Sequence, residues 1–335
     1  MGKSPEVVAA TEVGNLKIMQ LKRVWSQWVP FKPNYDSNEF ELNQSLFDLM
    51  GINFKHALQY LLQNQPSFAE FEQWCIELAG KPSIEHINYF NSVITNLCST
   101  NAMEKVGLAT ERQANVLTEE DLAFWDENGY VIVKNAVDKE SCEKTTKLIC
   151  EHIGADLTDP KTWYSCQHTS GIWVELTNHP QLSLNRQSIR LKKAYSQLWQ
   201  RADIFPSIDQ CGFNPPVTMN NPYKGQAIHL DVDFNKPLHF ATQGILYLTD
   251  TTEQQGALTV IPGFHKTFAQ WLNEMQKAGV NNLQDFSGYQ TKAIAANAGD
   301  FIIWHHHLPH GSSPNQENQP RITQFINYKP IGPNY

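Results

Sequence analysis

The spacing of hydrophobic residues changes along the chain, from a helical period in the first third to short apolar runs in the last. Between residues 39 and 100, apolar positions recur every three to four residues, as on one face of an α-helix. After about residue 202, apolar runs such as QGILYLTD, GALTVIPG and GDFIIWHH are separated by Gly, Pro, Asn and Asp. This second pattern is typical of all-β sandwiches and jelly rolls.

Local signals predict where the N-terminal helices begin. Ser67 and Glu70 have the spacing of a capping box, and apolar residues follow them with a helical period. Ser83 is placed to start another helix after a Gly and a Pro have ended the first. Residues 1–38 are predicted to be irregular, because two prolines interrupt any helical pattern near their end.

The middle of the chain predicts alternating helices and loops. Residues 101–117 are polar without a period and are expected to form a linker. Thr118 then opens a short acidic helix that stops at a glycine, directly before the apolar strand 130–133. A further helix is expected at 138–152. Residues 155–222 show a weak pattern, with one helical stretch, and are expected to be mostly loop.

The length of 335 residues exceeds that of a usual single domain. We therefore predict a helical extension of unknown role at residues 1–116. A mainly β domain with flanking helices is expected at 117–335.

Charge argues against nucleic acid as a partner. The chain has 26 Lys and Arg residues against 34 Asp and Glu, a formal net charge of −8. No basic run offers the positive footprint that a phosphate backbone requires. Nucleic acid is therefore not an expected partner. A small-molecule substrate is expected from the candidate site described below, and the oligomeric state stays open.

The cysteines and the apolar segments predict a cytoplasmic protein. Six cysteines lie far apart without a C-x-x-C pair, as expected for reduced thiols rather than a disulfide framework or a zinc ribbon. No segment has the 18 or so apolar residues of a membrane helix, and the N-terminus lacks the apolar region of a secretory signal. We expect neither a membrane association nor export.

A candidate metal site begins with His229 and Asp231 in the sequence AIHLDVDF. Side chains two residues apart on a strand lie on the same face, about 6.6 Å apart at their Cα atoms, so both would reach one ion. Asp233 shares that face but would sit about 13 Å from His229, which is too far for the same ion. An isolated H-x-D pair is a weak signal, because the chain has 12 histidines.

The second half of the candidate site comes from HHHLPHGSSPNQENQPRITQF. His310 would supply a third ligand from a distant strand, and the small residues after it would leave room for a cosubstrate. Arg321 opens the strand RITQFINY, where Thr323 and Phe325 would share its face. A guanidinium inside a β-barrel needs an anion, and a carboxylate is its best match.

Two histidines and one carboxylate on one face of an octahedral ion leave three positions open, as in non-haem Fe(II) oxygenases. A 2-oxo acid and O2 would occupy those positions, with the far carboxylate of the acid held by Arg321. Because the metal supplies the reactivity, the protein needs no separate catalytic acid or base. We expect hydroxylation or desaturation of a substrate C–H bond.

The stretch from about Leu117 to Pro330 resembles the phytanoyl-CoA dioxygenase family of Fe(II)/2-oxoglutarate oxygenases. The resemblance rests on LTEEDLAFWDENGYVIVKNAV, the HLD pair, QGILYLTDTTEQQGALTVIPGFH and GDFIIWHHHLPHGSSPNQENQPRITQF. It implies a double-stranded β-helix, or jelly roll, and decarboxylation of 2-oxoglutarate to succinate. It also implies iron ligands at His229, Asp231 and His310. Arg321 and Ser312 would bind the distal carboxylate of 2-oxoglutarate, and Tyr247 would lie beside this cosubstrate.

The resemblance does not extend to the acyl-CoA substrate, because no basic cluster or pocket motif for coenzyme A is present. Two other classes of function stay open. One is a jelly-roll protein that binds a metal or ligand without turnover, and the other is a zinc hydrolase with the same three ligands. Arg321 and Ser312 favour the oxygenase, because neither alternative needs an anion clamp.

Further histidines and a tryptophan lie near the predicted ligands. His305, His306 and His307 are expected to line or support the pocket rather than bind the metal. His265, in the turn IPGFH, is expected to be structural. Trp304, at the end of an apolar run, is the expected substrate neighbour.

Overall fold

The computed structural model of the chain describes residues 7–29, 37–95, 113–234, 237–280 and 282–331. The chain forms two compact units. Unit 1 comprises Met1–Ala114, Tyr195–Ile208 and Tyr328–Tyr335, and unit 2 comprises Asn115–Ala194 and Asp209–Asn327. Two segments from later in the chain thus belong to the same unit as the N-terminal helices.

Unit 1 is helical, with one short strand pair. Its elements are α1 (Leu21–Trp28), the 3-10 helix η1 (Ser37–Glu39), α2 (Phe40–Leu49), α3 (Phe54–Asn64), α4 (Phe68–Ala79), α5 (Ile84–Ile94), β4 (Ile204–Pro206) and β12 (Tyr328–Pro330). Strands β4 and β12 pair antiparallel. The capping box of Ser67 and Glu70 is confirmed at the start of α4, and Ser83 caps α5 as predicted.

The prediction that residues 1–38 are irregular is wrong for α1. Its eight residues form a helix that buries Leu21 and Val24 in the core of unit 1 and ends before Pro30. The prolines limit the C-terminal end of this helix but do not affect the turns before it. The predicted linker lies outside the described residues from 101 to 112.

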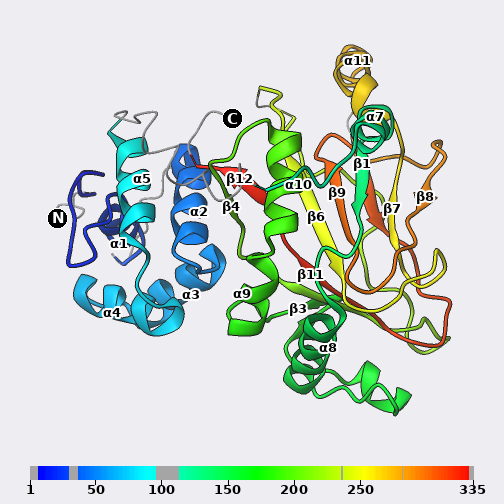
Figure 1. Cartoon of the computed structure of the whole chain (residues 1–335), viewed down its shortest axis with the longest axis horizontal. Helices are drawn as coiled ribbons and strands as arrows, with labels where there is room; N and C mark the ends of the chain where they lie inside the picture. Colours follow the sequence, from blue (N-terminus) through cyan, green and yellow to red (C-terminus); the bar gives the residue numbers. More distant parts are fainter. Residues whose placement is uncertain (1–6, 30–36, 96–112, 235–236, 281, 332–335) are drawn as a thin grey trace. The chain divides into compact units, whose positions relative to one another are not determined.

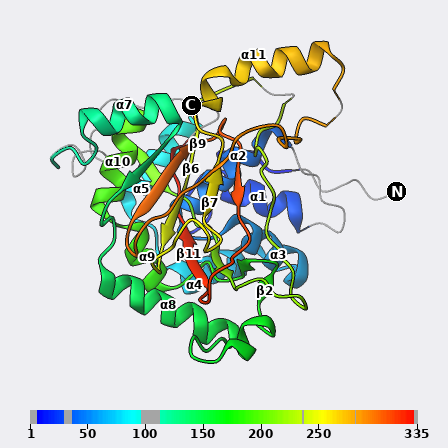
Figure 2. The ribbon, with the colours of Figure 1, turned by 90° about the vertical axis from the view of Figure 1, so that its right-hand side faces the viewer.

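Unit 2 contains the larger set of elements. They are α7 (Glu119–Asn128), β1 (Tyr130–Val133), α8 (Lys139–Ile153), η2 (Pro160–Tyr164), β2 (Thr169–Ser170), β3 (Trp173–Val174), α9 (Pro180–Arg186), β5 (Cys211–Asn214), β6 (Thr242–Tyr247), β7 (Leu258–Val260), α11 (Phe264–Lys277), β8 (Lys292–Ala293), β9 (Phe301–His305), β10 (His310–Ser312) and β11 (Arg321–Phe325). Helix α10 (Ile189–Trp199) has residues in both units. In unit 2, α7 and α11 lie at one end and α8 at the other (Figure 1 and Figure 2).

A seven-stranded antiparallel sheet in the order β1-β9-β6-β11-β5-β3-β2 forms the main layer of unit 2, and β10-β7-β8 form a second sheet. The predicted strands at 130–133, in the three apolar runs and at Arg321 are confirmed. The expected mainly β core with flanking helices is present as a large antiparallel sheet with helices beside it. The short elements β2, β3 and α9 within 155–222 were not predicted, because none is long enough to show a period.

The register of the large sheet determines which side chains face the interior of unit 2. Ile302 lies opposite Ile245, and Tyr247 lies opposite Thr323. Ile245, Tyr247 and Ile302 all belong to the same buried hydrophobic core. Because residues directly opposite in a ladder share a face, Thr323 and hence Arg321 lie on the face that carries this core.

The junction of α7 and β1 follows the predicted local signals. Thr118 caps α7 in a capping box, and Gly129 ends the helix with φ +76°. A Cβ at Gly129 would lie 2.5 Å from Nδ1 of His265. His265 in turn contacts the Asp126 carbonyl oxygen through Nε2, at 3.1 Å. These contacts agree with the structural role expected for His265.

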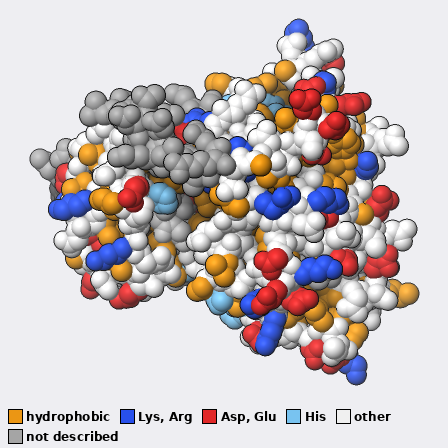
Figure 3. Space-filling model, viewed as in Figure 1, with side chains coloured by type: hydrophobic (Ala, Val, Ile, Leu, Met, Phe, Trp, Pro, Cys, Tyr) orange, Lys and Arg blue, Asp and Glu red, His pale blue; other side chains and the backbone are white. Residues whose placement is uncertain are grey.

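None of the helices in the described part of the chain has both the length and the apolar character needed to cross a lipid bilayer. On the face shown in Figure 3, basic side chains are interspersed with acidic ones among the residues that are coloured. This distribution agrees with the absence of a basic run in the sequence.

Candidate metal and anion site

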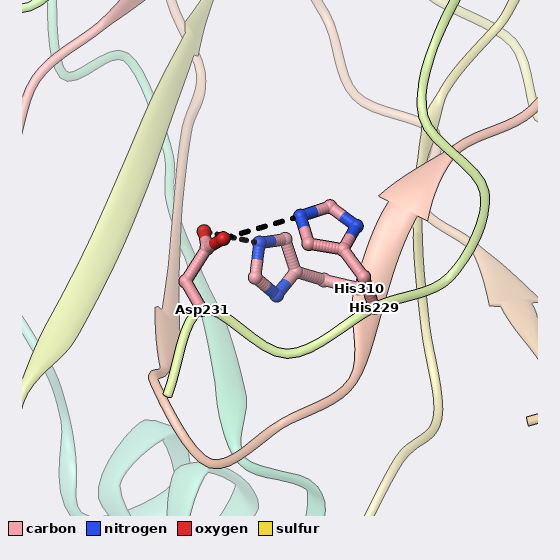
Figure 4. Close-up of side chains that lie close together, drawn as sticks. All are labelled: His229, Asp231 and His310. Carbon is pink, nitrogen blue, oxygen red and sulfur yellow. Dashed lines mark ion pairs between the residues drawn. The ribbon is translucent and has the colours of Figure 1, made fainter. Parts of the chain in front are cut away.

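His229, Asp231 and His310 lie together in unit 2. Their potential ligand atoms are all within 4.8 Å of one another. Nε2 of His229 is 3.4 Å from Oδ1 of Asp231, and Nε2 of His310 is 3.4 Å from Oδ2. Figure 4 shows both imidazoles directed toward the carboxylate. Among the described residues, this is the one group of three or more His, Cys, Asp or Glu side chains placed to hold a metal ion.

The backbone holds the two histidines side by side. His229 and His310 form an isolated antiparallel bridge, with N–O distances of 2.8 and 2.9 Å. Their ring centroids are 4.7 Å apart. The prediction that His229 and Asp231 lie in one regular strand is wrong, because Asp231 follows the bridge in irregular backbone. Its carboxylate nevertheless reaches both rings.

Backbone carbonyls orient the two imidazole rings. Nδ1 of His229 is 2.8 Å from the Ala227 oxygen, and Nδ1 of His310 is 3.0 Å from the Leu308 oxygen. A carbonyl oxygen only accepts hydrogen bonds, so Nδ1 must carry the proton in each ring. In the neutral imidazole this leaves the Nε2 lone pair, on the side of Asp231, free to bind a metal.

Asp231 supplies the negative charge of the group. Hydrogen bonds to His229 and His310 hold the pKa of this carboxyl well below its usual range. Burial lowers the pKa of His229, but the hydrogen bond to Asp231 and the Ala227 carbonyl outweigh this effect, so the pKa is raised overall. The side chain of Asp231 is 52% exposed, whereas that of His310 is only 7% exposed. The group is thus open to solvent on the carboxylate side.

Arg321 lies at the start of β11, opposite Asn214 on β5. It is only 1% exposed, and its Nε has no hydrogen-bond partner in the structure. No Asp or Glu of the described ranges forms an ion pair with it. Burial lowers the pKa of the guanidinium, and Tyr247 and Tyr223 oppose this effect. A buried cation without a carboxylate partner is the arrangement expected of an anion-binding site.

Ser312 lies two residues after His310 on β10, opposite Leu258. The phenol of Tyr223 contacts the Ser312 carbonyl oxygen and lies 2.5 Å from its Oγ. Burial raises the pKa of Tyr223. The hydrogen bond to Ser312 and the positive charge of Arg321 partly oppose this rise. Sequence reasoning assigned no role to Tyr223, because it lies in a loop where no period or motif indicates its partner.

Tyr247, which the resemblance places beside the cosubstrate, is fully buried. Its hydroxyl accepts a hydrogen bond from the Leu258 amide, at 2.8 Å, and donates one to the Ile294 carbonyl, at 3.0 Å. The hydroxyl oxygen of Thr323, opposite Tyr247, is buried without a hydrogen-bond partner. Both side chains lie on the same face of the sheet as Arg321.

The remaining histidines form a cluster of their own beside the candidate metal site. His305, His306 and His307 pack against one another with ring centroids 4.3 to 6.1 Å apart. None of them belongs to the metal-binding group. Trp304 is only 2% exposed and donates a hydrogen bond to Gln243, so it supports the site from within the sheet.

Gly311 gives a test of how the backbone supports His229. A Cβ at Gly311 would lie 2.8 Å from the Ala227 oxygen, which orients the His229 ring. We expect Gly311→Ala to displace this carbonyl, lower the free energy of unfolding by about 1–3 kcal/mol and weaken metal binding. Urea unfolding and Ni2+ dialysis would measure both effects. Gly288→Ala is the matched control, because its Cβ would meet no atom within 4 Å.

Comparison with known proteins adds independent information. Residues 125–323 match the family model described as phytanoyl-CoA dioxygenase (PhyH). A Dictyostelium discoideum protein, whose name assigns it to the phytanoyl-CoA dioxygenases, is 24% identical over 258 residues, which are 62% of this chain and 74% of that protein.

Solved structures to which this chain is similar include HygX from Streptomyces hygroscopicus with nickel and 2-oxoglutarate bound. It has 16% identity and a TM-score of 0.49, covering 64% of this chain and 88% of HygX. Another is the apo form of EctD from S. alaskensis, with 18% identity and a TM-score of 0.44, covering 67% of this chain and 83% of EctD. The family model spans more than half of the 335 residues. This chain is therefore a member of the phytanoyl-CoA dioxygenase family.

Proposed function

We propose that this chain is a non-haem Fe(II)- and 2-oxoglutarate-dependent dioxygenase. It would hydroxylate a C–H bond of a small organic substrate and convert 2-oxoglutarate and O2 to succinate and carbon dioxide. We further propose that the two sheets of unit 2 form a double-stranded β-helix. Membership of the phytanoyl-CoA dioxygenase family supports both proposals.

His229, Asp231 and His310 would hold the iron. The donor set fits this ion, because two neutral imidazoles and one carboxylate are the ligands of the facial Fe(II) sites of oxygenases. Both Nε2 atoms face the Asp231 carboxylate, while both Nδ1 atoms contact backbone oxygens. When bound, the iron would supply the activation of O2 that the side chains of the protein cannot provide.

Arg321 and Ser312 would bind the distal carboxylate of 2-oxoglutarate, with Tyr247 beside the cosubstrate. The observation that carries the proposal is the buried Arg321, which has a free Nε and no carboxylate partner among the described residues. A buried guanidinium is stabilised by a bidentate carboxylate. Ser312 shares strand β10 with His310, so a cosubstrate held at Ser312 would lie near the metal site.

The residues of the chain would act by positioning and by excluding water. Arg321 and Ser312 would hold one end of the cosubstrate, so that its keto acid end lies toward His229, Asp231 and His310. Ile245, Ile302 and Leu258 belong to the buried apolar core that carries this face of the sheet, and this core would limit the water around a bound cosubstrate. A fixed orientation of the cosubstrate reduces the entropy lost when the reacting groups reach the transition state.

Asp231→Ala tests the proposed metal role. Removing one of three protein ligands should reduce Fe(II) affinity by more than the roughly 10–100-fold typical of changes behind a metal site. Release of succinate from 2-oxoglutarate under air should fall below detection. Anaerobic equilibrium dialysis would measure Fe(II) binding, and chromatography would measure succinate.

Asp233→Ala is the matched control, because Asp233 lies two residues further in the same segment but outside the group of three. It should leave Fe(II) binding unchanged. Tight Zn2+ binding by the wild type, with hydrolysis of ester substrates and no succinate, would replace the proposal with a zinc hydrolase. Metal and 2-oxoglutarate binding without succinate across a metabolite extract would indicate a binding protein.

A further inference from the structure

Gln243 and Trp304 form a short hydrogen-bonded chain behind Asp231. Nε2 of Gln243 donates to Oδ2 of Asp231 at 2.7 Å, and Nε1 of Trp304 donates to Oε1 of Gln243 at 2.9 Å. We infer that Gln243, oriented by Trp304, is a positioning residue that sets the direction of the Asp231 carboxylate for metal binding. This inference rests on the proposed metal role of Asp231.

The chemistry of the three groups determines which way the Gln243 amide points. The indole nitrogen of Trp304 can only donate a hydrogen bond, and the ionised carboxylate of Asp231 can only accept one. The amide oxygen must therefore face Trp304, and the amide nitrogen must face Asp231. The opposite orientation would place two donors together at one end and two acceptors at the other.

Asp231 needs such a support more than the two histidines do. The backbone of His229 and His310 is held by their mutual bridge, whereas Asp231 lies in irregular backbone with a half-exposed side chain. In the part of the chain that the structure describes, Gln243 is the one side chain other than the two histidines hydrogen-bonded to this carboxylate.

The chain of contacts ends within the large antiparallel sheet. Gln243 on β6 pairs directly with Trp304 on β9, which pairs in turn with Tyr130 on β1. The Trp304 ring is buried and lies 5.1 Å from the His310 ring. The amide of Gln243 therefore links the Asp231 carboxylate to the large sheet.

The contact also limits how Asp231 would bind a metal. An oxygen that accepts the Gln243 amide proton has one lone-pair direction occupied, so Oδ2 is the weaker metal ligand. Oδ1, which faces His229 and carries no contact with Gln243, would then be the ligating atom. Binding through one oxygen leaves more coordination positions for a cosubstrate.

A double-mutant cycle on metal affinity tests the inference. Gln243→Leu and Trp304→Phe, singly and together, would be compared with the wild type by anaerobic equilibrium dialysis against Ni2+ alone. Gln243→Leu should weaken Ni2+ binding roughly 10–100-fold. Trp304→Phe, which keeps the ring but removes the donor, should weaken it less. In the double variant Trp304→Phe should add nothing, because its effect passes through Gln243.

Gln324→Leu is the control for loss of a strand glutamine that lies away from the candidate metal site. Gln324 lies on β11, and its amide contacts Asn185 and the Leu182 carbonyl rather than the metal site. It should lower the melting temperature and leave Ni2+ affinity unchanged. Additive effects of Gln243→Leu and Trp304→Phe on Ni2+ affinity would overturn the inference. Unchanged Ni2+ affinity in Gln243→Leu would also overturn it.

The experiment separates this inference from the proposed function. If the wild type itself fails to bind Ni2+, or if Asp231→Ala binds it normally, the proposed metal site is wrong. If the wild type binds Ni2+ through Asp231 while the Gln243 and Trp304 variants match it, only the positioning role is wrong. If Gln243→Leu does not fold, the Ni2+ affinity of Trp304→Phe still tests the positioning role.

Discussion

Arg321→Ala is expected to weaken 2-oxoglutarate binding by about 2–5 kcal/mol, or roughly 30- to 5,000-fold in Kd. The reason is that the distal carboxylate of 2-oxoglutarate would lose its charged partner in a buried site, where an unpaired charge is costly. Affinity for Ni2+ should stay unchanged, because Arg321 is not part of the group of His229, Asp231 and His310. Calorimetric titration of the Ni2+-loaded protein with 2-oxoglutarate would measure the loss.

Two control variants make the result specific. Arg321→Lys keeps a positive charge without the bidentate fork and should recover part of the affinity. Arg186→Ala also removes a buried arginine, but the Arg186 guanidinium donates to the Asp209 carbonyl and not to the candidate site. It should destabilise the protein without changing the Kd. Equal losses of Ni2+ and 2-oxoglutarate affinity in Arg321→Ala would contradict the anion-binding role.

The histidine cluster should make the metal-free protein unstable in acid. Burial, together with repulsion between the rings when protonated, lowers the pKa of His305 and His306 to about 3, and burial and neighbouring histidines lower that of His307 to about 4. The unfolded chain binds these protons near pH 6.5. The free energy of unfolding should therefore fall as the pH drops from about 6.5 toward 4.

The expected slope is at most about 1.4 kcal/mol per pH unit for each histidine. It is smaller for His305 and His306, which are partly exposed. Urea unfolding of the metal-free protein at several pH values would measure this slope. His307→Gln should reduce the slope, because it removes one histidine whose pKa burial lowers. A stability that stays constant between pH 6.5 and 4.5 would contradict this explanation.

The two predictions concern different properties of unit 2. Arg321 is a permanently charged group whose burial requires a partner, so its replacement changes ligand affinity. The cluster of His305, His306 and His307 is buried in its neutral form, so acid changes folding stability. In the metal-free protein His229 acts in a different pH range, because Asp231 raises its pKa. The stabilisation from its protonation is fully present below about pH 6.5 and is lost as the pH rises above that value. Asp231→Ala would remove this contribution.

Local signals in the sequence were sufficient to predict where several helices and strands begin and end. The capping box at Ser67, the helix from Thr118 to Gly129 and the following strand all lie where the sequence predicts them. Each depends on residues within a few positions of one another, so no distant contact is needed to define it. The alternation along β11 likewise placed Arg321, Thr323 and Phe325 on one face.

Other features depend on contacts between segments that are distant in the sequence. The sequence alone determined the helical N-terminal region, the main strands and the three candidate ligands. Only the tertiary structure decided that Asp231 lies in irregular backbone, that Tyr223 contacts Ser312, and that Trp304 reaches Asp231 through Gln243. The reason is physical: helix caps and strand alternation follow from neighbouring residues, whereas hydrogen bonds across 12 and 61 residues exist only once the sheet has brought their partners together.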